Sequence, residues 1–218
     1  MSEAPGLLVF LDTNVLAKPV TRSLLLFAAS ASGYSVTWSA FVENEADRHR
    51  RDGQVSVAQV RQSAGLELSA SSDRSDTFVG TSVKDRPVLA DAVGVGATLI
   101  ITEDVDDFGE TDLTAAVTSA VNPDLFLAER VTTDAFREAV TRMAAPMAHP
   151  PRTPEQLFIQ LGRQHPLATD AHKTAFDAAP MPATHHPPAV LFRGHLCLRC
   201  LRICDDLVTG VCGDCRSA

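Results

Sequence analysis

The N-terminal part of the chain contains an apolar run that ends in an acidic turn. The run is Leu7–Phe10, and the pentapeptide Leu11–Val15 (LDTNV) follows it. A leucine-rich stretch with helical character then extends from Leu16 to Ala29. An apolar strand that turns into a helix at an aspartate places this carboxylate at the carboxyl edge of a sheet, where open α/β sheets bind ligands. Asp12 is therefore a candidate site residue, although an aspartate at this position is also an ordinary helix N-cap.

Three more acidic residues follow strand or helix signals along the chain. Glu45 lies in a helix that begins at Ser39, a good N-cap, after the β-rich run Tyr34–Trp38. Asp85 stands at the start of another helix, which carries a proline in its first turn, and Asp104 follows a buried-type apolar strand. This alternation of strands and helices favours an α/β fold with a parallel sheet.

In this order the segments resemble the PIN-domain ribonucleases, and in particular the VapC-type toxins of bacterial toxin–antitoxin pairs. The likeness rests on LDTNVL, WSAFVENEADR, KDRPVLADAVGVGATLIITEDVDDF and NPDLFL, and it covers roughly residues 7 to 130. Each piece is weak alone, but four in the right order are fairly specific. The resemblance implies a PIN-like three-layer α/β/α sandwich with a central parallel sheet, and the activity of a metal-dependent endoribonuclease that cleaves RNA.

The resemblance also implies a set of carboxylates that hold Mg²⁺ or Mn²⁺. Asp12 is expected to be the central ligand, with Asp85 and Asp104 as further ligands and Glu45 as a ligand or a water-orienting group. Hard divalent cations prefer oxygen ligands. Carboxylates crowded at one sheet edge would repel one another without a cation. A bound metal would relieve this repulsion and activate water for attack on a phosphodiester.

Two of these assignments have a neighbouring competitor. Glu43 and Glu45 diverge by about 200° on a helix, so only one of them can face the site. Glu45 lies one turn after Phe41, which we expect to face the core, and the family pattern also favours Glu45; Glu43 remains the alternative.

At the second position, Asp104, Asp106 and Asp107 compete. The family's strand–Thr-x-Asp arrangement favours Asp104 after Thr102, and Asp107 is a plausible supporting or second-metal residue. Asn14 and Thr102 are candidates to orient the carboxylates by hydrogen bonds.

The five cysteines all fall within the last 22 residues. Four of them form two CxxC pairs, Cys197/Cys200 and Cys212/Cys215, separated by 11 residues. This spacing is typical of a zinc ribbon, in which four thiolates bind one structural Zn²⁺. A segment this small needs the metal to fold. Cys204 is expected to be a free thiol.

The region between these two features changes character. Residues 132–147 and 155–163 have helical spacing, and a proline-rich stretch without periodicity follows. Such a stretch is typical of an extended, semi-rigid linker, which would leave the ribbon on a flexible tether. The expected organisation is a PIN-like nuclease domain over residues 1–145, a helical extension over 146–178, a linker over 179–192 and the zinc ribbon over 193–218.

The net charge of −8 opposes an RNA-binding function, because RNA binding depends on Lys and Arg that neutralise phosphates. A metal-bound carboxylate cluster would account for part of the excess. No N-terminal signal or membrane-spanning stretch is recognisable, so we expect a cytoplasmic protein without membrane contact.

The biological role most consistent with the likeness is a toxin that a cognate antitoxin silences, and the family commonly forms homodimers. The added ribbon departs from the simple toxin pattern. It raises a housekeeping role in the maturation of rRNA or tRNA as an alternative. A non-catalytic PIN scaffold that binds RNA or protein is a further alternative.

Overall fold

The fold is built on a central β-sheet. A computed structural model describes residues 7–147, 151–184 and 186–218. In it five strands form one sheet in the order β2-β1-β3-β4-β5. The strands are β1 (Leu7–Leu11), β2 (Tyr34–Thr37), β3 (Leu99–Ile101), β4 (Ser119–Val121) and β5 (Phe192–Arg193). The first four are parallel, as expected, but β5 pairs antiparallel with β4, so the sheet is only mostly parallel.

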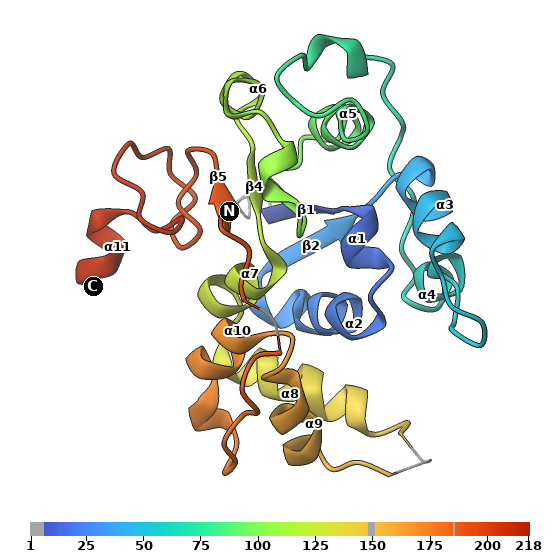
Figure 1. Ribbon diagram of the computed structural model, residues 1–218, viewed down its shortest axis with the longest axis vertical. Helices are drawn as coiled ribbons and strands as arrows, with labels where there is room; N and C mark the ends of the chain where they lie inside the picture. The colour runs from blue at the N-terminus through green and yellow to red at the C-terminus, as the bar shows by residue number, and fades with distance from the viewer. Residues whose placement is uncertain (1–6, 148–150, 185) are drawn as a thin grey trace, which may run out of the picture.

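Eleven α-helices lie in the described residues and make the fold α/β. They are α1 (Thr13–Leu16), α2 (Pro19–Ala28), α3 (Ala40–Arg48), α4 (Val57–Ser63), α5 (Arg86–Gly94), α6 (Glu110–Ala116), α7 (Pro123–Arg130), α8 (Thr133–Ala144), α9 (Pro154–Leu161), α10 (Pro166–Ala171) and α11 (Gly213–Ser217). Figure 1 shows helices on both sides of the sheet, with α5 and α6 above it and α2 and α7 below it in this view.

Local sequence signals explain where several helices begin. Ser39 caps α3, and its hydroxyl accepts a bond from the Val42 amide. Thr153 caps α9 with a capping box, in which the Gln156 side chain also accepts from the Thr153 amide. The leucine-rich stretch is divided into α1 and α2, because Pro19 occupies the first position of a second helix.

The core joins the sheet to the helices that follow it. Phe10 of β1, Trp38 after β2 and Phe126 of α7 are fully or almost fully buried. Phe136 of α8 and Phe158 of α9 belong to the same cluster of buried side chains. The expected helical extension therefore shares the core of the sheet domain.

The C-terminal segment is attached to the sheet edge. β5 pairs with β4, and the Leu196 amide donates to Ser119 Oγ at 3.2 Å. Gly194 has φ +130°, and a Cβ on it would lie 2.2 Å from Ser119 Oγ, so this approach requires glycine. Arg199 forms a 2.8 Å ion pair with Glu129. These contacts hold the segment against the domain, in contrast to the flexible tether expected from the proline-rich sequence.

None of the helices in the described part of the chain combines the length and the apolar composition that a membrane crossing requires.

Candidate functional site

Asp12 lies at the carboxyl end of β1, where the chain turns into α1. Its carboxylate accepts bonds from the Thr13 amide at 2.6 Å and from the Thr102 hydroxyl at 2.7 Å. The residue is only 3% exposed. Burial raises the pKa of Asp12 to about 7; the two hydrogen bonds lower it, and the charges of Asp85 and Asp104 raise it further. The site thus holds a carboxyl group that a nearby cation would ionise at neutral pH.

Asp104 is brought to the same edge because β3 pairs with β1. Its side chain is exposed, and Asn14 Nδ2 donates to it at 3.3 Å and to Thr102 Oγ1 at 3.1 Å. The side-chain oxygen of Asn14, Oδ1, accepts a hydrogen bond from the Glu103 amide at 3.1 Å. Asn14 and Thr102 therefore connect the loops after β1 and β3, as expected of groups that orient the carboxylates.

The two glutamates of α3 point in different directions. Thr13 Oγ1 donates to Glu45 at 3.2 Å, so Glu45 lies beside the turn that carries Asp12. Glu43 is buried and accepts from Trp38 Nε1 at 2.9 Å and from Arg61 Nε at 2.9 Å. Glu43 therefore has partners inside the fold, and Glu45 is the glutamate near Asp12.

The expectation that Phe41 faces the core is wrong. Phe41 does not face the core: it is 38% exposed, whereas Val42 and Ala46 are fully buried. The core-facing side of α3 is set by these smaller residues, so the size of an apolar side chain does not identify the buried face.

Asp85 and Asp107 are linked through a lysine. Lys84 Nζ lies 2.8 Å from Asp107 and 3.9 Å from Asp85. Ser82 Oγ donates to Asp85 at 2.8 Å, and burial is the main cause that raises the pKa of Asp85. The hydrogen bond with Asp107 raises the pKa of Lys84. The ammonium group of Lys84 thus already neutralises part of the negative charge of Asp85 and Asp107.

Asp106, the competitor of Asp104, points elsewhere. It forms a 2.8 Å ion pair with Arg193 of β5.

Sequence reasoning missed Thr13 and Ser82 as partners of the carboxylates. Each is a hydroxyl residue within three positions of a site acid, which is a weak signal.

The carboxylates gather at one edge, but they do not form a closed ligand cage. In the described part of the chain, the four cysteines are the only set of three or more potential ligands whose ligand atoms all lie within 4.8 Å of one another. Mg²⁺ typically uses only one or two protein carboxylates, together with water and substrate phosphate. The oxygen donors at this edge therefore suit Mg²⁺ or Mn²⁺ in chemistry, whereas their spacing does not by itself define a site.

The cysteines expected to bind zinc do converge. Cys197, Cys200, Cys212 and Cys215 lie together, and the sulfurs of Cys200 and Cys212 are 3.8 Å apart. Zn–S bonds of about 2.3 Å in a tetrahedron place neighbouring sulfurs about 3.8 Å apart. Cys204 lies outside the cluster, as expected. The four thiols can bind a metal such as zinc.

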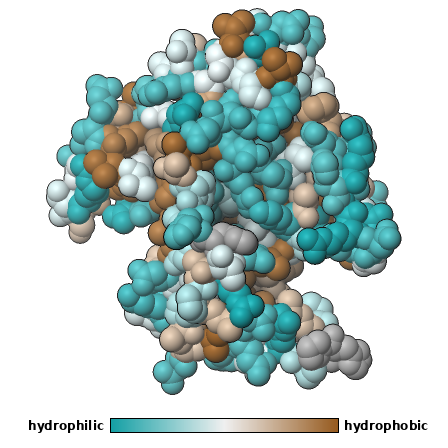
Figure 2. Space-filling view, in the orientation of Figure 1, coloured by the Kyte–Doolittle hydropathy of each residue, from teal (hydrophilic) through white to brown (hydrophobic). Residues whose placement is uncertain are grey.

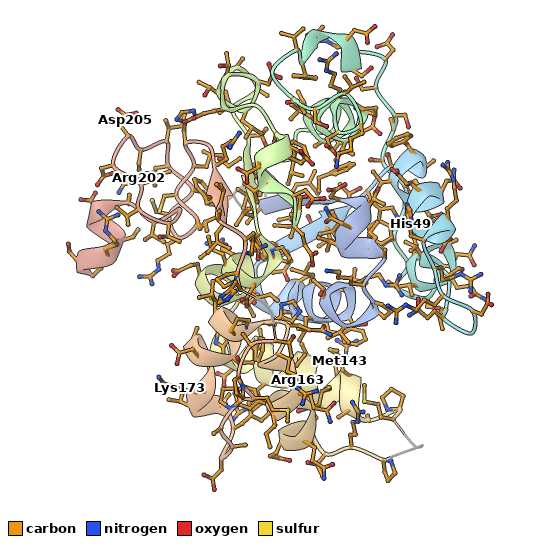
Figure 3. The ribbon with its side chains drawn as sticks, viewed as in Figure 1. His49, Met143, Arg163, Lys173, Arg202 and Asp205 are labelled. Carbon is orange, nitrogen blue, oxygen red and sulfur yellow. The ribbon has the colours of Figure 1, made fainter. Side chains whose placement is uncertain are left out.

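Charged and amide groups support these thiols. The Arg202 guanidinium is the main cause that lowers the pKa of Cys200 to about 6. The Cys212 amide donates to Cys197 Sγ at 3.4 Å. Figure 3 labels Arg202 on this C-terminal module, away from the main body of the sheet. Such groups favour the thiolate form, which is the form that binds metals.

A scan of the chain against protein-family models, a search of curated proteins and a search of solved structures find no match. The likeness to PIN-domain ribonucleases therefore rests on the residue pattern alone.

Proposed function

We propose that this protein is a metal-dependent endoribonuclease whose active site is the acidic edge of the sheet. The observation that carries the proposal is the buried carboxyl group of Asp12, whose pKa of about 7 reflects its burial and the nearby Asp85 and Asp104. Burying an acid beside other acids costs stability, and such an arrangement is typical of functional sites. A bound Mg²⁺ or Mn²⁺ would supply an activated water and neutralise charge on the phosphate.

The protein groups have distinct tasks in this proposal. Thr102 and the Thr13 amide fix both oxygens of Asp12, so its carboxylate is oriented before any ligand arrives. Asp104, held by Asn14, and Asp85, held by Ser82, complete the set of metal ligands. Glu45 lies to the side of Asp12, next to Thr13, where it would orient a water. Asp107 holds Lys84 and has a supporting task.

The proposed biological role is that of a toxin silenced by a cognate antitoxin. The net charge of −8 suits a partner with a basic segment that covers the acidic edge. Expression of the protein alone in a bacterial host tests this role. Growth arrest and RNA fragmentation by the wild type, but not by an Asp12→Asn, Asp104→Asn double variant, would support it. If the wild type cuts RNA in vitro but is harmless in the cell, RNA maturation becomes the better role.

A second candidate is a binding protein that no longer cuts RNA. Lys84 favours it, because its ammonium group lies 2.8 Å from Asp107 and 3.9 Å from Asp85 and offsets charge that a metal would otherwise offset. The two candidates differ in a direct assay. The nuclease cleaves RNA when Mn²⁺ is added, whereas the binding protein binds RNA but does not cleave it.

The C-terminal module is proposed to be a structural zinc ribbon. Its four sulfurs lie within 4.8 Å of one another, and its contacts with Ser119 and Glu129 hold it beside β4 and α7. Elemental analysis of protein purified under reducing conditions tests this assignment, with about one equivalent of zinc expected for a single Cys₄ site.

A further inference from the structure

A groove of about 780 Å³ adjoins the acidic edge of the sheet. One wall is formed by the turn between α1 and α2 and by the loops after β3 and β4, and it includes Lys18 and Asp104. The segment between α9 and α10, which includes Arg163, also lines the groove. The groove is thus continuous with the candidate active site and is completed by the helical part of the chain.

The groove is lined by three basic and three acidic side chains, and the acids are Glu103, Asp104 and Asp124. We call it the basic groove, after the basic side chains Lys18, Arg51 and Arg163. Figure 3 labels His49 at the end of α3 and Arg163 at the end of α9, and both residues line the groove. Figure 2 shows hydrophilic residues predominating over α3 and α4, and the loop between these helices contributes His49, Arg51 and Gln54 to the groove. Lys18, Arg51 and Arg163 come from three separate parts of the chain.

Two of these cations are available to a ligand. Arg51 and Arg163 are exposed, and neither guanidinium takes part in an ion pair or a side-chain hydrogen bond among the residues that the structure describes. In contrast, Lys18 is paired with Glu103. The Asp124 carboxylate in the same wall is occupied by the amides of Leu167 and Ala168. Apart from Asp104, which belongs to the acidic edge, the charge that the groove offers is thus that of the two arginines, which suit phosphate oxygens.

We propose that the basic groove binds the backbone phosphates of single-stranded RNA next to the phosphodiester at the acidic edge. This inference deepens the proposed nuclease function, on which it rests. A recess of this volume is in the range that encloses small ligands rather than a duplex. Single-strand binding proteins combine a cationic groove with flat side chains for stacking. The imidazoles of His49 and His186 are exposed flat ring groups in this groove, and Gln54 and Gln164 add amides for base edges.

The test measures binding separately from cleavage. All proteins carry Asp12→Asn, and binding of a labelled 12-nucleotide single-stranded RNA is measured by anisotropy in Mg²⁺ over a range of salt concentrations. The test variant is Arg51→Ala, Arg163→Ala. The control variant is Arg74→Ala, Arg137→Ala, which removes the same charge from exposed positions that do not line the groove.

The test variant is expected to bind at least about tenfold more weakly, because each guanidinium contributes a charge-assisted contact. Its slope of log K against log salt is expected to be shallower by about 1.4, or about 0.7 for each lost phosphate contact on a single strand. The control variant is expected to retain its affinity and slope, and a duplex of the same sequence is expected to bind more weakly than the single strand. Melting temperatures confirm that both variants are folded.

Equal losses in the two double variants would overturn the inference, because binding would then follow net charge alone. Duplex binding that is as tight, and as sensitive to the two arginines, would also overturn it. Groove-dependent binding without any cleavage by the wild type would refute the nuclease but retain the groove as an RNA site. Cleavage by an Arg51→Ala, Arg163→Ala protein at the wild-type rate would refute the groove as the RNA site but retain the nuclease.

Discussion

The Thr102 hydroxyl donates a 2.7 Å hydrogen bond to Asp12 Oδ2 and so joins the ends of two neighbouring parallel strands. This bond is one of the causes that lower the pKa of Asp12, against the larger effect of burial. The contact ties the fold to the proposed chemistry, because the pairing of β1 with β3 sets the distance between the two residues.

Replacement of Thr102 by Val removes this bond with little change in volume. A hydrogen bond to a charged group contributes about 1.5–3 kcal/mol, so the pKa of Asp12 is expected to rise by about 1 or more above its value of about 7. At subsaturating Mn²⁺, cleavage at pH 7 should fall about fivefold or more and recover above pH 9. A pH–rate profile in Mn²⁺ measures this change. An unchanged acidic limb would show that Asp12 does not control the rate.

The stability of the protein should fall as Asp12 ionises. Its pKa is about 7 in the folded protein and 3.8 as a free side chain, so the folded state resists deprotonation. The resulting cost develops as the pH rises from about 4 to about 7 and is constant above that range. Asp12→Asn should therefore stabilise the metal-free protein by roughly 2–4 kcal/mol at pH 8 and by little near pH 4. Urea unfolding at the two pH values tests this difference.

The effect of added Mn²⁺ on thermal stability should also depend on the ionisation of Asp12. It should raise the melting temperature of the wild type more at pH 8 than at pH 5, because binding requires the ionised carboxylate. Asp12→Asn should show little increase at either pH. An equal increase in both proteins would place the cation elsewhere.

The two glutamates of α3 should separate stability from activity. Glu43→Gln weakens the buried contacts with Trp38 and Arg61 and should cost about 1–3 kcal/mol of unfolding free energy, with cleavage retained in the folded protein. Glu45→Gln should leave stability nearly unchanged and reduce cleavage. Paired urea unfolding and cleavage assays make this comparison. A loss of cleavage in Glu43→Gln, together with a loss of stability in Glu45→Gln, would show that Glu43 is the site residue.

Lys84→Met should increase the affinity for Mn²⁺ by about three- to tenfold, because it removes an ammonium group that lies 2.8 Å from Asp107 and 3.9 Å from Asp85. Calorimetric titration at pH 7.5 measures the affinity. A weaker affinity in the variant would mean that Lys84 supports the site rather than competing with the cation.

Parts of this fold could be predicted from residues alone. Ser39 and Asp12 stand directly between an apolar run and a helix, and both cap the following helix in the structure. The two CxxC pairs predicted the cluster of four sulfurs because ligand spacing in such modules is local.

The long-range features could not be predicted in this way. β5 contains only two residues, and its pairing with β4 depends on the close approach of Gly194 to Ser119, which no local pattern indicates. The position of Lys84 among the carboxylates depends on the course of the loop before α5. The exposure of Phe41 depends on what packs against α3, so apolar character alone could not place it.

Cleavage of RNA by the purified protein tests the proposed nuclease activity directly. The wild type, Asp12→Asn and the matched control Asp106→Asn are incubated with single-stranded RNA, with and without Mn²⁺. Asp106 is an exposed acid that is paired with Arg193 rather than with the site. Mn²⁺-dependent cleavage is expected of the wild type and the control, with a loss of at least about 100-fold in Asp12→Asn. An Asp12→Asn protein that cuts as fast as the wild type, or a folded wild type that cuts nothing, would refute the proposed nuclease.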